Sequence, residues 1–94
     1  SHPMDMTQAI QNAKTPSDHE ALAKHYEDTA KEMQSKLQEH KKMLETYEAN
    51  TSHYGRQALD LQAHCRNLIN SYEQAVKANI AMANSHRSMA IEIK

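Results

Sequence analysis

The feature that most constrains the fold is the near absence of helix-breaking residues. The chain contains one Gly and two Pro among 94 residues, whereas an all-β sandwich or barrel needs many turns built from such residues. Neither residue occurs between Pro16 and Gly55 or after Gly55. Both stretches consist mainly of good helix formers such as Ala, Leu, Glu, Lys, Gln and Met. The sequence therefore predicts an all-α protein with two long helices.

A short N-terminal arm is expected before the first long helix. Apolar residues at helical spacing predict a short helix over about 4–13, and these residues are Met6, Ile10 and Ala13. Thr15 followed by Pro16 is typical of an N-cap and a first helical position, so a long helix is expected over about 16–49. Residues 1–3, which precede Met4, fit either a cloning remnant or the start of a chain after signal removal.

A single polar cluster in the middle of the chain is expected to reverse its direction. Asn50 suits the end of one helix, and Thr51 or Ser52 suits the cap of the next. We expect the next helix over about 52–92, with Gly55 in its exposed first turn. The length favours one domain, in which an arm over 1–15 precedes a helical hairpin over 16–94.

Heptad spacing in both long helices predicts the seam, meaning the line along which the two helices pack. In the first long helix the two expected seam rows are Ala23, Ala30, Leu37 and Leu44, and His19, Tyr26, Met33, His40 and Tyr47. In the second they are Leu61, Leu68, Ala75, Met82 and Met89, and Ala58, Cys65, Tyr72, Asn79, His86 and Ile93, with Ile69, Val76, Ala83 and Ala90 beside them. Two helices cannot bury stripes this wide by themselves. We therefore expect a homodimer that completes a four-helix bundle; a three-helix monomer is the alternative.

The composition excludes several classes of protein and partner. Lys and Arg number 11 against 12 Asp and Glu, and they are interspersed, so no basic stripe for nucleic acid exists. No apolar run approaches the roughly 18 residues of a membrane span. The single Cys excludes an intrachain disulfide. Six Met, seven His and four Tyr occur where Leu, Val and Phe are scarce, which indicates a seam rich in potential metal donors.

The first candidate metal site lies near the turn. In an antiparallel hairpin that reverses at Asn50 to Ser52, residues whose numbers add to about 102–105 lie opposite each other. His40, with Met43 on the same face, then falls close to His64 and Cys65. Imidazole with thiolate suits Zn(II), and an added thioether favours copper as Cu(I). The alternative is a polar layer in which these side chains satisfy one another and Cys65 packs as a small apolar residue.

The second candidate site lies at the open end of the hairpin. Met82, His86 and Met89 share one stripe and have His19 opposite, which resembles a Cu(I) ligand set. The alternative is that the two Met side chains fill the core. His25 lies off the seam and is expected either to supply a ligand to a dimer partner or to face solvent.

Motifs of enzymes are absent from the sequence. No Glu has a His three residues later, as di-iron bundles require, and the zinc-protease pattern H-E-x-x-H is missing. No C-x-x-C-H motif is present, so a haem could bind only non-covalently between seam His and Met residues; we favour haem less than copper or zinc. The sequence predicts a non-enzymatic protein.

Two segments, from His25 to Tyr47 and from Ala63 to Ala90, resemble small, largely uncharacterised bacterial helical proteins that are often exported. The shared pattern is His-Tyr, then His with Met three residues later, then His-Cys, then Tyr and a late His. The resemblance implies a periplasmic or cell-envelope location and a metal-related role. It draws attention to His25, His40, Met43, His64, Cys65 and His86.

The leading hypothesis from the sequence is a small metal-binding bundle, for copper first and zinc second, that sequesters or delivers the ion. The contrasting hypothesis is a structural or protein-interaction module whose polar seam determines helix register and dimerisation.

Overall fold

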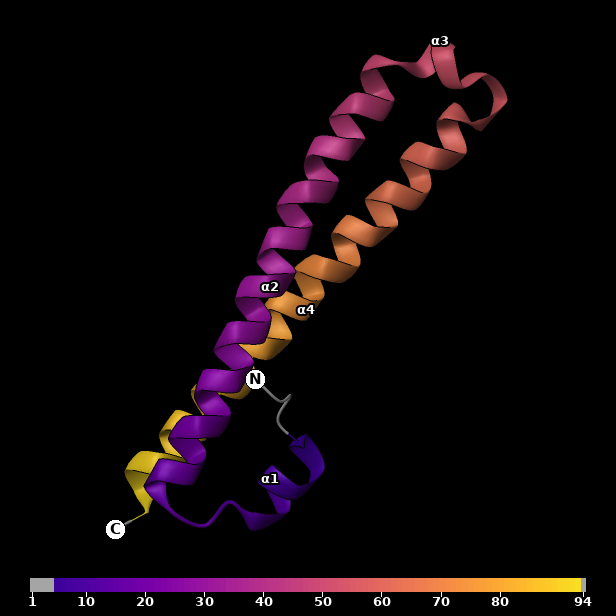
Figure 1. Cartoon of the computed structure of the whole chain (residues 1–94). Coiled ribbons are helices and arrows are strands. Elements are labelled where there is room, and N and C mark those ends of the chain that lie inside the picture. Colours follow the sequence, from indigo (N-terminus) through magenta and orange to yellow (C-terminus); the bar gives the residue numbers. More distant parts are fainter. Residues whose placement is uncertain (1–4, 94) are drawn as a thin grey trace.

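The protein is a long antiparallel helical hairpin preceded by a short helix, as the sequence predicts (Figure 1). The computed structural model describes residues 5–93. Two long helices, α2 (Pro16–Ala49) and α4 (Ala58–Glu92), pack along their whole length. Short helix α1 (Met6–Asn12) lies beside α2 near the open end of the hairpin. The molecule measures 62 × 24 × 17 Å and is therefore much longer than it is wide.

The start of α2 is fixed by a capping box. Thr15 Oγ1 accepts a hydrogen bond from the Asp18 backbone N–H at 3.1 Å, and Asp18 Oδ2 accepts one from the Thr15 N–H at 3.0 Å. The Lys14 N–H also donates to this carboxylate at 2.9 Å. These donors, the Lys14 N–H first, lower the pKa of Asp18 below its ordinary value because they stabilise its charged form. The expected N-cap and first helical position are thus confirmed.

Helix α1 is shorter than expected at both ends. It covers Met6–Asn12 rather than 4–13, and Met4 lies outside the described residues. Asp5 is the N-cap, and its carboxylate accepts a hydrogen bond from the Gln8 N–H at 3.3 Å. The expected second end, Ala13, has an extended backbone instead of a helical one. Helix α1 packs on α2 and forms no close backbone contacts with α4.

The reversal differs from the sequence expectation. Instead of one helix from residue 52, the chain forms a short helix α3 (Thr51–Tyr54), a 3-10 turn η1 (Gly55–Gln57) and then α4. Gly55 separates them because its φ of 57° and ψ of −128° cannot continue a helix. Gln62, just inside α4, donates to the Tyr47 carbonyl and to Thr51 Oγ1 at 3.4 and 3.1 Å. The second long helix, α4, therefore begins at Ala58, six residues later than position 52, where the sequence predicts its start.

We expect Gly55→Ala to lower the free energy of unfolding by roughly 1–3 kcal/mol. The cost is backbone strain, because a Cβ at this position would meet no atom within 4 Å, while a positive φ is unfavourable for alanine. Urea unfolding followed by circular dichroism measures the effect. Ser52→Ala, in the exposed helical turn nearby, is the control and should stay within about 0.5 kcal/mol of wild type. Equal midpoints for the two variants would contradict the strained conformation.

The buried core is a narrow strip along the seam. On α2 the buried side chains are Leu22, Ala23, Ala30 and Leu37, and on α4 they are Ala58, Gln62, Cys65, Ala83, His86 and Ala90. The expected first row of α2 is confirmed, since three of its members are buried. On α4 the expected row with Ala58, Cys65 and His86 is confirmed, whereas three members of the other expected row, Leu68, Met82 and Met89, are exposed. Ala83 and Ala90, which are expected beside the seam, are buried in it, since small side chains let two helices approach closely.

No helix within residues 5–93 is long and apolar enough to cross a membrane.

Candidate metal-binding site

A hollow of about 190 Å³ lies between α2 and α4 in the half of the hairpin nearer the turn. Its walls consist of His40, Met43, Tyr47, Leu61, His64, Cys65 and Leu68. All four residues of the first candidate site, two imidazoles, a thioether and a thiol, therefore line one hollow. They come from both helices, so the antiparallel register is what brings them together.

Within the hollow, each donor group has a different environment. The Cys65 side chain is buried, and its thiol donates to the His40 backbone carbonyl at an Sγ to O distance of 3.3 Å. The His40 ring is half-buried and stacks on Tyr72 with ring centroids 5.2 Å apart. His64 and Met43 are exposed. The four donors thus extend from the seam to solvent, which leaves an open path for an ion.

The open end of the hairpin contains a histidine pair. His19 Nδ1 and His86 Nδ1 lie 3.0 Å apart, a distance at which one ring nitrogen donates its N–H and the other accepts the hydrogen bond. His86 is buried, and its ring is stacked between His19 and Tyr26. Burial first, and the charge of His19 second, lower the pKa of His86 below its ordinary value. Both effects disfavour a protonated His86.

The two methionines of the second candidate site lie outside this pair. Met82 and Met89 are exposed on the flank of α4, four residues before and three residues after His86. The structure therefore brings His19 and His86 together but leaves both thioethers at the surface. Helical spacing predicts that all three α4 residues lie on one stripe, but only His86 is buried, while Met82 and Met89 are exposed.

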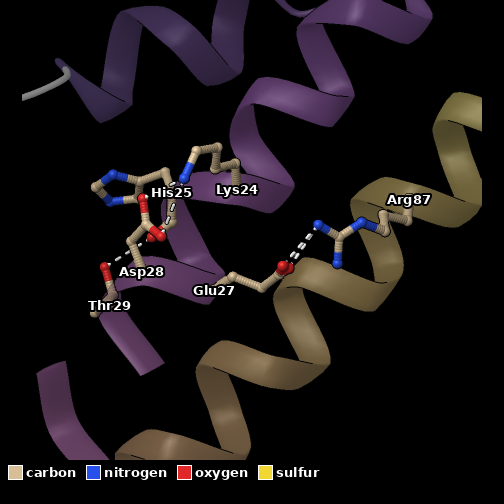
Figure 2. A network of polar contacts seen from close by, with 6 residues as sticks. All are labelled: Lys24, His25, Glu27, Asp28, Thr29 and Arg87. Carbon is tan, nitrogen blue, oxygen red and sulfur yellow. Dashed lines mark hydrogen bonds and ion pairs between the residues drawn. The ribbon is translucent and has the colours of Figure 1, made fainter. Parts of the chain in front are cut away.

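His25 lies apart from both groups of donors. Figure 2 shows its ring on the side of α2 away from α4, near Asp28, whereas Glu27 reaches across to Arg87. The His25 ring contacts Tyr26 edge-on, with centroids 5.7 Å apart. It is half-buried and belongs neither to the wall of the hollow nor to the pair of His19 and His86.

No group of three or more His, Cys, Asp or Glu side chains within residues 5–93 is arranged so that it could hold a metal ion. In the hollow the reason is visible: the Cys65 thiol points at a backbone carbonyl, and the His40 ring lies on Tyr72. The structure brings the sequence-predicted donors into one place without converging them on one point.

The residues that the sequence interpretation missed are polar groups at the edges of the seam. Arg87 Nη2 donates to both carboxylate oxygens of Glu27 at 2.8 and 2.6 Å, and this bond lowers the pKa of Glu27. Arg87 also lies 3.7 Å from Glu20, and Arg66 lies 3.7 Å from Glu48. Opposite charges on rows that flank the heptad seam are the signal that could have identified them.

Comparisons with known proteins provide no independent assignment. A scan against protein-family models and searches of curated proteins and solved structures found no match to this chain.

Proposed function

We propose that this protein binds a soft metal ion, Cu(I) in first place and Zn(II) in second, and that it sequesters or delivers the ion rather than transforming a substrate. The observation that carries the proposal is the hollow lined by His40, Met43, His64 and Cys65. A thiolate, a thioether and imidazoles are the ligands that soft and borderline ions prefer. An exported location, which the resemblance to small bacterial helical proteins implies, belongs to the same proposal.

Binding requires small movements of side chains and the loss of one proton. The Cys65 thiol must release its proton, because the thiolate is the ligand, and it must turn away from the His40 carbonyl. The His40 ring must leave its stack on Tyr72. His64 and Met43 are exposed and can rotate into the hollow without disturbing the core. The backbone of both helices can therefore stay in place.

We expect the reduced, metal-free protein to bind Cu(I) at submicromolar affinity and Cys65→Ser to bind it at least about 100-fold more weakly. Changes that leave the ligands in place already cost 10–100-fold in affinity, and this change removes a ligand while keeping the side-chain size. An anaerobic titration against a chromophoric Cu(I) chelator measures both constants. A bound ion also raises the melting temperature, since it stabilises only the folded state.

A matched control is available in the turn. His53 is exposed and lies outside the hollow, so His53→Ala should bind Cu(I) as wild type does. The proposal fails if the wild-type protein competes for neither Cu(I) nor Zn(II), or if Cys65→Ser retains the wild-type affinity.

A second candidate function, a structural or protein-interaction module, is favoured by one specific observation. Among the described residues no buried side-chain nitrogen or oxygen lacks a hydrogen-bond partner, so the polar seam is satisfied without an ion. Combined replacement of His40, His64 and Cys65 separates the two candidates. A purely structural role predicts that this variant changes the molecular mass or the melting temperature of the metal-free protein, and that wild type takes up no metal.

A further inference from the structure

The two flanks of the hairpin seam differ in charge. On one flank, ion pairs join the helices, from Arg87 to Glu27 and Glu20 and from Arg66 to Glu48. On the other flank, every seventh residue of α4 is apolar from the turn to the open end, and Met43 of α2 lies beside this row. We call this second flank the apolar face; it consists of Met43, Leu61, Leu68, Ala75, Met82 and Met89.

The apolar face lacks the charges that keep a helix surface in water. Four of its side chains are exposed, with exposed fractions between 38% and 45%. The next row of α4 toward solvent consists of His64, Ser71, Ala78 and Ser85. No Lys, Arg, Asp or Glu therefore occurs on either row from Leu61 to Met89. An uncharged stripe of this length on a protein with 23 charged residues is typical of an interface rather than of a free surface.

The surface area indicates how large the missing contact is. The chain exposes 6863 Å², whereas a compact monomer of 10.7 kDa exposes about 5,500 Å². A standard protein interface buries about 800 Å² per partner, so the excess is enough for one. The radius of gyration of 18.5 Å, against about 12 Å for a compact domain of this length, supports the same conclusion.

We propose that the apolar face packs against the apolar face of a second copy of this chain and that the second copy covers the hollow. An uncharged face can meet its own copy without repulsion between like charges, as a two-fold symmetric interface requires. Leu61 and Leu68 belong both to this face and to the wall of the hollow, so a chain lying on them closes it. The statement about the hollow rests on the proposed metal binding; the interface does not.

Closure of the hollow by the second copy explains why the candidate metal ligands of a single chain do not point at one position. His64 and Met43 are exposed in the single hairpin and lie where the second copy arrives. A partner would remove water from these side chains and limit their rotamers, which raises the affinity of a site built from them. Metal binding and self-association are therefore coupled through one surface.

Sedimentation equilibrium of the metal-free protein, with a chelator and a reductant present, tests the interface. The wild-type chain is expected to have twice the mass of one chain, and Leu68→Glu and Met82→Glu the mass of one. Leu59→Glu and Ile80→Glu are matched controls, since both positions are exposed on the other flank of α4, and they should remain dimeric. A wild-type monomer, or a dimer broken by Ile80→Glu but not by Leu68→Glu, overturns the proposal.

A milder variant distinguishes loss of the interface from unfolding of the chain. Leu68→Ala preserves helix propensity and is expected to raise the dissociation constant of the dimer at least tenfold while the circular dichroism spectrum stays unchanged. An unchanged dissociation constant in this folded variant also overturns the interface.

A Cu(I) titration of the same variants separates the interface from the proposed function. If wild type is a dimer that takes up no Cu(I), and Leu68→Glu is a monomer, the interface is supported and metal binding is contradicted. A wild-type monomer that binds Cu(I) contradicts the interface and supports metal binding. If both proposals hold, Met82→Glu, whose position lies outside the wall of the hollow, binds Cu(I) at least tenfold more weakly than Ile80→Glu does.

Discussion

Leu22→Ala is expected to lower the free energy of unfolding by about 3 kcal/mol, within the range measured for leucine truncation in protein cores. Leu22 is 1% exposed and is the largest fully buried side chain of the described residues. A hairpin with so few buried residues has little stability in reserve. The melting temperature should fall by about 12–24 °C, since 1 kcal/mol corresponds to roughly 4–8 °C in a domain of this size.

Leu59→Ala is the matched control for this variant. Leu59 is also a leucine in a long helix, but its side chain is 73% exposed, so we expect a change within about 0.5 kcal/mol. Thermal unfolding must be compared at equal protein concentration, because the proposed association of the folded chains would stabilise them by mass action. Equal losses for the two variants would show that Leu22 is not part of a packed core.

The second large expected effect is a loss of stability in mild acid. The pKa of His86 is lowered in the folded protein by burial and by the charge of His19. The unfolded chain therefore binds a proton at a higher pH than the folded chain does, and stability rises with pH in that interval. The contribution is complete above the ordinary His pKa of about 6.5 and is lost as the pH falls from there to the lowered folded value.

The contacts of His86 explain why its protonation destabilises the folded protein. Two protonated rings would direct donors at each other across the 3.0 Å between His19 Nδ1 and His86 Nδ1. Tyr26 covers the other side of the ring, and the next charged group, Arg87, is already paired with Glu27 and Glu20. Within residues 5–93 no carboxylate is paired with His86, so no ion pair stabilises its protonated form.

Chemical unfolding of wild type and His86→Gln between pH 7.5 and 5 measures the effect. The free energy of unfolding of wild type should fall more steeply, by at most the roughly 1.4 kcal/mol per pH unit that one proton supplies. His53→Gln, at an exposed position in the turn, should retain the wild-type slope. Parallel curves for wild type and His86→Gln would rule out His86 as the source.

Much of the candidate site could be predicted from the sequence because a helical hairpin has few free variables. Once Asn50 was taken as the end of α2, antiparallel pairing determined which residues face each other to within about one turn of helix. The close approach of Cys65 to His40 and of His19 to His86 follows from that counting. The metal itself remains a proposal.

The errors of the sequence interpretation have two physical sources. Gly55 has a positive φ, a conformation that glycine permits but that no sequence pattern predicts. This conformation interrupts the helix, so α4 begins only at Ala58. The second source is rotation of α4 about its axis. Rows that contain Leu68 or Ala83 are both apolar, so periodicity alone could not decide which of them packs on α2.

The sequence by itself determined two long helices, the start of α2 at Thr15 and Pro16 and the antiparallel register of the two helices, because these depend on local propensity and on the position of one turn. Only the tertiary structure decided that the small side chains of Ala83 and Ala90 lie in the seam and that Leu68, Met82 and Met89 lie outside it. Close packing selects the smaller residues for the narrow contact between two helices, and this choice leaves the larger apolar residues exposed.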